Sequence, residues 1–502
     1  MTTFEILETT ISGLQTAMEN GIINAQQIVT RYLERIEAID KVVNAILELN
    51  PEVLNSAALL DKERITQGSR GPLHGIPLLI KDNIETADRM PTTAGSLALA
   101  NHFARQDAFS ISRLRSAGAI ILGKTNLSEW ANFRSTRSSS GWSSRGGQTH
   151  NPYVLSRNPC GSSSGSGVAV SANLCAAAVG TETDGSIVCP AHMNGIVGLK
   201  PTIGLVSRSG IIPIAHSQDT AGPMARTVRD AAILLGGMVG IDSRDPVTRT
   251  SNGRYYNDYT QFLDIQGCKG ARIGVARNFF GKHPASDLLM EKAIGTLKQL
   301  GAEIIDPANI ETMQQIKNSK LSVLLYEFKA DLNSYLANLD TDIGILSLAD
   351  LIAYNEARAD KVMPLFGQEL FYQAQEKGSL QEAEYLAALA NNHRYMQAEG
   401  IDAVIGKHQL DAIIAPTGGP TWLTDHVNGD HYTGSCSSAA AVAGYPHITV
   451  PMGFVAGLPL GISFFAGAFT EPTLLKLAYA FEQATRARKP PHLLSTINPA
   501  TN

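Results

Sequence analysis

Lys81, Ser162 and Ser186 are the side chains of this sequence that could together activate a hydroxyl group for attack on an amide. Lys81 ends an apolar run, residues 75–80, and both serines lie in segments punctuated by glycine. Amide hydrolysis needs a nucleophile, a base, donors for the oxyanion and an acid for the leaving nitrogen. A lysine accepts a proton only if burial keeps its amine neutral, which the apolar run favours. The three residues therefore predict a serine hydrolase that needs no histidine.

A different serine is the nucleophile if the segment 161–165 is interpreted as the G-x-S-x-G elbow of α/β-hydrolases, which selects Ser163. That mechanism requires an acid and then a histidine further along the chain, whereas His216 precedes Asp219. We therefore prefer Ser186. The twelve histidines show no metal-ligand spacing such as H-E-x-x-H, so we expect no metal site and assign no role to His192 or His216.

Residues 118–125 match the phosphate-loop formula G-x-x-x-x-G-K-[ST] letter for letter. A phosphate loop presents flexible backbone N–H groups after a strand, but here the four middle residues are apolar and form a strand pattern themselves. We expect neither nucleotide binding nor any other cofactor.

Composition limits the partners and the compartment. The 502 residues carry 41 Lys+Arg against 46 Asp+Glu, a formal charge of −5, without the basic stripe that nucleic acids attract. No segment reaches the roughly 18 apolar residues of a membrane helix, and the N-terminus has no signal-peptide pattern. We expect a cytoplasmic protein that binds no membrane, although removal of a signal peptide stays open. The five cysteines predict neither a disulfide framework nor a zinc site, but small buried side chains.

Alternating strand and helix patterns predict an α/β protein in one domain, residues 1–502. Within it, residues 310–400 predict a mainly helical layer. The individual elements expected are two amphipathic helices within 5–47, strands at 76–80 and 119–122, a helix near 111–117, a buried helix at 168–179, alternating strand and helix patterns over 273–305, strands at 412–416, 447–451 and 460–465, and a last helix at 471–487.

Two glycine-rich strings carry a resemblance to a known family. Residues 160–166 and 180–191 match motifs of the types GGSSGGS and GTDTGGSIRxPA, with their key serines 24 positions apart. The sequence resembles the amidase signature family over nearly its whole length. The resemblance implies one large domain with a central mixed β-sheet covered by helices on both sides.

The resemblance also implies a role for each site residue. Ser186 is then the nucleophile that forms an acyl-enzyme, Ser162 the proton bridge and Lys81 the general base. The peptide bond from Gly161 to Ser162 is expected to be cis, and backbone N–H groups across Thr183, Asp184, Gly185 and Ser186 are expected to stabilise the oxyanion.

Several departures from the family pattern bear on the prediction of the substrate. Ser164 and Asp184 replace glycines, and Val188 replaces a common arginine. With the segment 327–333, they make the chain similar to bacterial peptide amidases, which implies a small peptide amide as substrate and residues 310–400 on the substrate side. Asp184 could orient the leaving amide, bind a positive group or face away.

Other roles and functions stay open. Ser138 and Ser139 either line the cleft or belong to a solvated loop. The alternative functions are the glutaminase-like subunit of a tRNA-dependent amidotransferase, a broad aryl or alkyl amidase, and a non-catalytic binding protein on the same scaffold. We expect a monomer or a weak homodimer.

Overall fold

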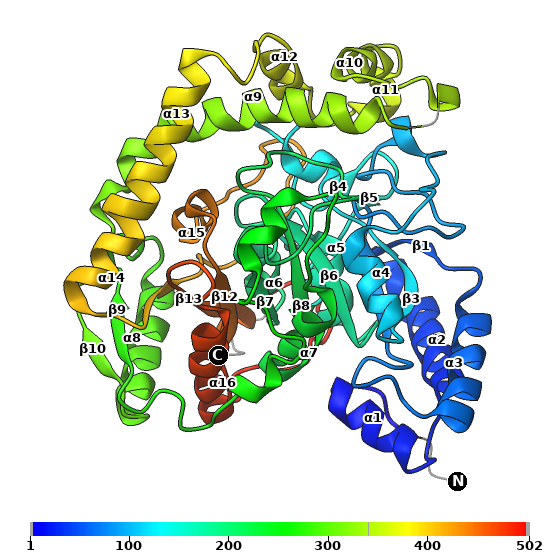
Figure 1. Ribbon diagram of the computed structural model, residues 1–502, viewed down its shortest axis with the longest axis horizontal. Coiled ribbons are helices and arrows are strands. Elements are labelled where there is room, and N and C mark those ends of the chain that lie inside the picture. The colour runs from blue at the N-terminus through cyan, green and yellow to red at the C-terminus, as the bar shows by residue number, and fades with distance from the viewer. Residues whose placement is uncertain (1–3, 340, 498–502) are drawn as a thin grey trace.

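A large mixed sheet forms the centre of the molecule (Figure 1). The computed structural model describes residues 4–339 and 341–497. Within these residues eleven strands form the sheet, in the order β1 (Ile46–Leu49), β3 (Ile120–Thr125), β2 (Pro77–Lys81), β6 (Ala177–Glu182), β8 (Thr220–Ala225), β7 (Val197–Lys200), β12 (His447–Val455), β13 (Leu458–Phe465), β11 (Ala412–Pro416), β9 (Arg272–Val275) and β10 (Glu303–Ile305). The short strands β4 (Trp142–Ser143) and β5 (Gly147–Gln148) pair separately.

The middle of the sheet is covered on both sides, which explains its composition. Strands β3, β2 and β6 run parallel, whereas β8, β7, β12 and β13 pair antiparallel. Every residue of β2 and β6 is buried, as expected of apolar strands with helices on both faces. Helices α5 (Ser164–Ser171) and α6 (Val188–Met193) pack against each other and the sheet, as do α7 (Val228–Met238) and α16 (Glu471–Thr485). The predicted fold class is confirmed.

The N-terminal segment forms the two predicted helices, α1 (Ile11–Glu19) and α2 (Ala25–Val43), followed by α3 (Val53–Gln67). Asn24 begins α2 with a capping box: its side chain accepts the Gln27 N–H at 2.8 Å, and Gln27 Oε1 accepts the Asn24 N–H at 3.0 Å. In the described part of the chain, no helix has the length and hydropathy that spanning a membrane requires.

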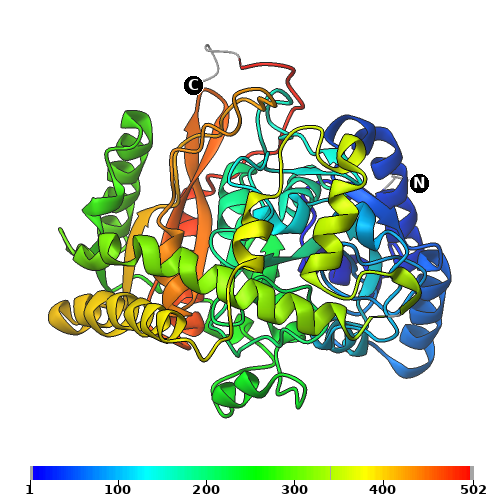
Figure 2. The same ribbon diagram turned by 90° about the horizontal axis from the view of Figure 1, so that it is seen from above.

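Most of the described residues within 310–400 lie in helices, as the sequence predicts, and these helices form an arc along one side of the sheet domain (Figures 1 and 2). Aromatic rings pack the arc against the rest of the molecule: the ring centroid of Phe328 lies 5.0 Å from that of Phe133, and the ring centroid of Phe371 lies 5.9 Å from that of Trp130. The helices of the arc are α9 (Lys317–Leu336), α10 (Leu348–Glu356), α11 (Ala359–Val362), α12 (Glu369–Gln375) and α13 (Ala383–His393). The remaining helices are α4 (Phe109–Ser116), α8 (Pro284–Gln299), α14 (Asp402–His408) and α15 (Ser437–Ala443).

The prediction of one buried helix over 168–179 is wrong in its second half. Helix α5 ends at Ser171, Asn173 takes a left-handed φ of 60°, and residues 177–179 belong to β6. Small apolar residues suit a buried helix and a buried strand equally well, so composition alone did not separate the two.

The prediction that no cysteine forms a disulfide is also wrong. Cys160 and Cys189 are joined, with their Cα atoms 6.2 Å apart. The segments that carry Ser162 and Ser186 meet in space, which brings these two cysteines together without any signal in their spacing along the chain. Cys175, Cys268 and Cys436 are buried and free, as expected.

Candidate active site

Lys81 is the last residue of β2, and its side chain is completely buried. Its Nζ lies 2.7 Å from Ser162 Oγ, 2.8 Å from Thr181 Oγ1 and 3.4 Å from the Thr181 carbonyl oxygen. Burial lowers the pKa of Lys81 to about 7, although the negative charges of Asp219 and Glu182 act to raise it. A neutral amine can donate its two hydrogens to Thr181 and direct its lone pair at Ser162.

Ser162 follows a cis peptide bond from Gly161, as the family resemblance implies. A Cβ atom at position 161 would lie 2.1 Å from Ser128 Oγ, so a larger residue there would displace the Ser128 side chain. The Ser162 carbonyl oxygen accepts the Ser128 N–H at 3.1 Å, and the whole residue is buried. These contacts hold Ser162 in place, with its hydroxyl group in hydrogen-bond contact with Lys81 Nζ.

Ser186 lies in the loop between β6 and α6, next to the segment of Ser162. Its carbonyl oxygen accepts the Ser163 N–H at 3.1 Å, and its side chain lines a cavity of about 600 Å³. Gly185 precedes it with φ of 83°, a left-handed conformation in which a Cβ would lie 3.0 Å from Ser437 Oγ. The structure thus brings the three predicted catalytic residues into one region and exposes Ser186 to the cavity.

A buried carboxylate that sequence reasoning missed shapes this loop. Glu182 Oε2 accepts the N–H groups of Ile187 at 2.8 Å and Val188 at 3.0 Å, which folds the chain back around Ser186. Burial raises the pKa of Glu182, while Lys200 and these amides act in the opposite direction. An acidic residue within the second motif, at the end of a small-residue strand, was the available signal.

Asp184 does not face away into solvent but binds a positive group of its own chain, and a role toward the substrate stays a prediction. It forms an ion pair with Lys320 of α9, and it accepts the hydroxyl groups of Ser437 and Ser438 at 2.6 Å each. Burial acts to raise the pKa of Asp184, but Lys320 and the two hydroxyl groups hold it below its ordinary value. The loop 183–186 is therefore tied to both α9 and α15.

The other predicted contacts fall in different environments. Thr183 lines the cavity and donates its hydroxyl group to Asp219 Oδ1 at 2.5 Å. Ser138 also lines the cavity, whereas Ser139 is buried outside that lining and donates to Gln148 Oε1 at 3.3 Å. Of the two, only Ser138 is in a position to meet a ligand in this cavity.

The two competing motifs have structural explanations. Ser163 Oγ donates to the Thr181 carbonyl oxygen at 3.0 Å and accepts the Thr181 N–H at 3.2 Å. Its hydroxyl group therefore hydrogen-bonds the backbone of β6 as both donor and acceptor. Lys124, the lysine of the phosphate-loop formula, lies in β3 and donates to the Ile84 carbonyl oxygen at 2.6 Å. Neither residue faces the cavity of Ser186.

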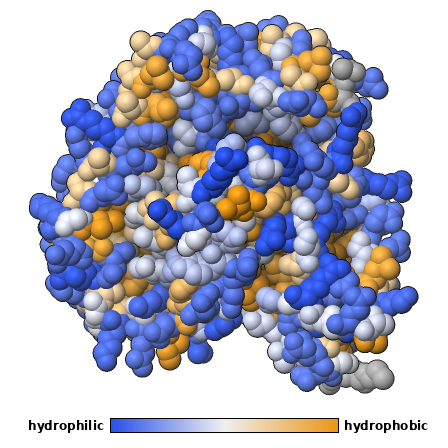
Figure 3. Space-filling view, viewed as in Figure 1, coloured by the Kyte–Doolittle hydropathy of each residue, from blue (hydrophilic) through white to orange (hydrophobic). Residues whose placement is uncertain are grey.

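The cavity of Ser186 is open to the surface and has a mixed lining. Figure 3 shows a hollow beneath the helical arc, where hydrophobic and hydrophilic residues adjoin. Helix α9 contributes Lys320 and Leu324 to its wall, and the loop before α15 contributes Trp422 and Asp430. A second cavity, of about 560 Å³, shares its wall at Thr183 with the first.

Comparisons with known proteins agree with this geometry. Residues 27–475 match the family described as Amidase. A crystal structure of native peptide amidase from Stenotrophomonas maltophilia has 50% sequence identity and a TM-score of 0.92, covering 98% of this chain and 100% of that one.

Two curated relatives extend the comparison. A probable amidase of Arabidopsis thaliana is 42% identical, over 98% of this chain and 93% of its own length. A glutamyl-tRNA(Gln) amidotransferase subunit of Halorhodospira halophila is 34% identical, over 95% of this chain and 97% of its own length.

Proposed function

The chain belongs to the amidase family and is an amide hydrolase, and we propose that it converts the C-terminal amide of small peptides into a carboxylate and ammonia. In this proposal Ser186 is the nucleophile, Ser162 the proton bridge and Lys81 the general base. The observation that carries it is the 2.7 Å hydrogen bond between Lys81 Nζ and Ser162 Oγ, fully buried beside the loop of Ser186, in which the neutral amine can accept the hydroxyl proton. Burial supplies the neutral amine that a lysine base requires.

The reaction proceeds through an acyl-enzyme. Neutral Lys81 takes a proton from Ser162, which takes one from Ser186, and Ser186 Oγ attacks the amide carbon. The proton returns from Lys81 through Ser162 to the leaving nitrogen, the C–N bond breaks and ammonia departs. A water molecule then uses the same path to hydrolyse the ester. Backbone N–H groups of the loop 183–186 stabilise the oxyanion in both steps.

The charges of the cavity support an uncharged amide as substrate. Among the described residues that line it, Lys320 is the one lysine or arginine, and Asp184 and Ser438 already bind its ammonium group. Asp430 adds a further negative charge. A free carboxylate therefore finds no unpaired cation, which disfavours glutamine as substrate and favours release of the acid product. The similarity to the peptide amidase and the wall formed by α9 support a peptide on this side.

The test is ammonia release by the purified chain alone. An N-acylated dipeptide amide, glutamine and an aryl acylamide are compared, with mass spectrometry of the peptide product and Ser186→Ala as the inactive control. We expect release from the peptide amide without tRNA, ATP or another subunit.

Each other outcome identifies a rival. Activity on glutamine only after addition of amidotransferase partners would favour the glutaminase-like subunit. Cleavage of the aryl amide alone would favour a broad amidase. No turnover together with no acylation of Ser186 would favour a binding protein.

The disulfide bears on the compartment. Because disulfides persist mainly in oxidising compartments, the bond between Cys160 and Cys189 supports an exported protein over the cytoplasmic location expected from the sequence. Mass spectrometry of the alkylated native protein tests this: labelling of both cysteines without prior reduction would contradict it.

A further inference from the structure

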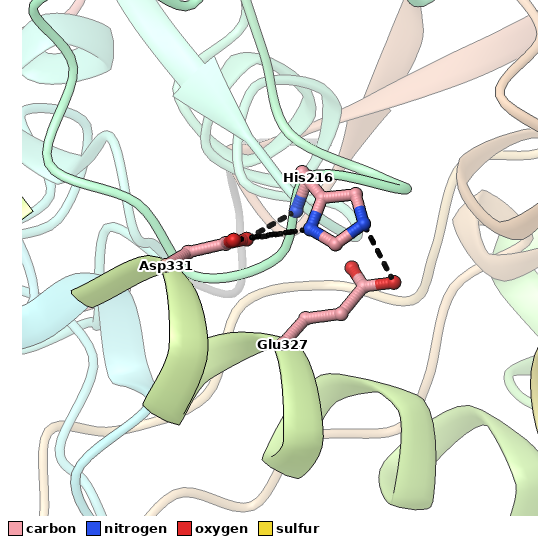
Figure 4. Close-up of side chains that lie close together, drawn as sticks. All are labelled: His216, Glu327 and Asp331. Atoms are coloured by element: carbon pink, nitrogen blue, oxygen red, sulfur yellow. Dashed lines mark hydrogen bonds and ion pairs between the residues drawn. The ribbon is translucent and has the colours of Figure 1, made fainter. Parts of the chain in front are cut away.

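His216 lies between two carboxylates of helix α9, in the segment that leads into β8 (Figure 4). Its Nδ1 is 2.9 Å from Asp331 Oδ2, and its Nε2 is 3.5 Å from Glu327 Oε1. The three side chains bring possible ligand atoms within 4.8 Å of one another. The cluster stands apart from Lys81 and Ser186 and takes no part in the proposed chemistry.

The orientation of the His216 ring shows whether the two carboxylates face a metal ion or the protonated ring itself. A metal ion needs one ring nitrogen and both carboxylates directed at a single point. Figure 4 shows instead that the two nitrogens point at different carboxylates, Nδ1 at Asp331 and Nε2 at Glu327. Nδ1 forms a hydrogen bond with Asp331, and Nε2 lies at ion-pair distance from Glu327, so the geometry fits an imidazolium ion, which is protonated on both nitrogens.

Other charges around the ring act in both directions. The hydrogen bond that the ring donates to Asp331 raises the pKa of His216 above its ordinary value, burial opposes this, Glu327 raises the pKa further, and Arg208 lowers it. Arg208 is itself paired with Asp245. From α13, the Tyr385 hydroxyl group donates to Glu327 Oε1 at 2.9 Å.

The same two carboxylates also hold the backbone of the segment. Asp331 Oδ2 accepts the His216 N–H at 2.9 Å, and Glu327 Oε2 accepts the Ser217 N–H at 2.9 Å. The segment is therefore fastened to α9 through its ring and its main chain at consecutive residues.

The fastened segment in turn holds the loop of the nucleophile. Asp219 Oδ2 accepts the N–H groups of Ile214 at 2.7 Å and Ala215 at 2.9 Å, and its Oδ1 accepts the Thr183 hydroxyl group at 2.5 Å. Gln218 Nε2 donates to the Thr183 carbonyl oxygen at 3.0 Å. A displacement of the segment is thus transmitted to Thr183, three residues before Ser186.

We propose that protonated His216 is a positioning residue that fastens the segment 214–219 to α9 and thereby fixes Thr183 at the start of the oxyanion loop. The inference rests on the proposed function for its kinetic consequence. The bridge is complete below the pKa of His216 and is lost as the pH rises through that value, because a neutral ring is no longer attracted to Glu327 by its charge and keeps at most its hydrogen bond to Asp331. Activity should therefore fall on the alkaline side while Lys81 remains neutral.

The kinetic test uses His216→Gln, with the exposed His492→Gln as matched control. For the wild type and the control we expect kcat/KM to decline above the pKa of His216. His216→Gln should be lower by about tenfold near the optimum, as expected for loss of a charged hydrogen bond, and should show no such decline. An alkaline decline that persists in His216→Gln would overturn the proposal.

Two measurements without turnover separate this inference from the proposed function. NMR titration of the His216 ring should give a lower pKa in Asp331→Asn than in the wild type, and Asp331→Glu should restore it. Hydrogen exchange of the peptide that contains residues 183–186 should accelerate in His216→Gln, but not in His492→Gln. An unchanged pKa in Asp331→Asn, or unchanged exchange in a folded His216→Gln, would contradict the bridge even if no amide were hydrolysed.

Discussion

Lys81 and Lys124 are completely buried lysines on adjacent parallel strands, and only one of them is suited to catalysis. Burial lowers the pKa of Lys81 to about 7 and that of Lys124 to about 8. Lys81 forms hydrogen bonds with the hydroxyl groups of Ser162 and Thr181. Lys124 donates hydrogen bonds to the Ile84 carbonyl oxygen and the Thr92 hydroxyl group, and it interacts with the charge of Asp82. A lowered pKa therefore does not by itself identify a base: we propose Lys81 because its amine contacts the Ser162 hydroxyl group, next to the loop of Ser186.

The largest change in activity is expected from replacing Lys81, the proposed base. Lys81→Met should lower kcat/KM by about 10³-fold, because general-base catalysis contributes about 10²- to 10⁴-fold. Steady-state ammonia release by protein with a confirmed cooperative unfolding transition measures this. A folded Lys81→Met with wild-type kcat/KM would remove Lys81 from the mechanism.

Lys124→Met is the matched replacement on the neighbouring strand. Its main effect should be a loss of stability of about 3 kcal/mol, since the buried Asp82 carboxylate loses a compensating charge. Urea unfolding measures the stability, and kcat/KM per folded molecule should stay within a factor of about three of the wild type. A catalytic loss as large as that of Lys81→Met would abolish the distinction between the two lysines.

The pH dependence tests the comparison without changing the base. A group with a pKa near 7 that acts when neutral gives a kcat/KM that rises through about pH 7 from the acid side. We expect this rise in the wild type and, at the same pH, in Lys124→Met. A rise that moved in Lys124→Met, or activity independent of pH well below neutrality, would argue against Lys81 as the base.

Replacement of a third lysine, Lys320, is expected to have a smaller effect, on substrate selectivity. Its removal in Lys320→Gln leaves the Asp184 carboxylate without its cation at the cavity wall. We expect the ratio of kcat/KM for arginine amides over leucine amides, compared in otherwise identical peptides, to rise by about fivefold to tenfold. Addition of Asp184→Asn should cancel the change, and an unaltered ratio in Lys320→Gln would show that the pair does not face the substrate.

The sequence revealed those parts of the site that are encoded locally. Ser162, Ser186 and Lys81 stand in short strings, and the structure places Lys81 against Ser162, while their catalytic roles stay a prediction. The strand 412–416 is an apolar run with polar neighbours, and the structure has a strand with these bounds. The helical layer followed from apolar periodicity in the same way.

The parts that were missed depend on contacts between distant segments. Thr181 reaches Lys81 across 100 positions, and Lys320 reaches Asp184 across 136. The disulfide likewise forms only because two loops converge. No local pattern carries this information, since a hydroxyl group or a charge in a single sequence has no preferred partner until the sheet sets the distances.

Labelling with a fluorophosphonate probe, followed by peptide mapping, tests the central claim most directly. The account predicts an adduct on Ser186, formed at a rate that rises through about pH 7, at the wild-type rate in Lys124→Met and only at a background rate in Lys81→Met. An adduct on Ser163, or equal rates in Lys81→Met and the wild type, would contradict it.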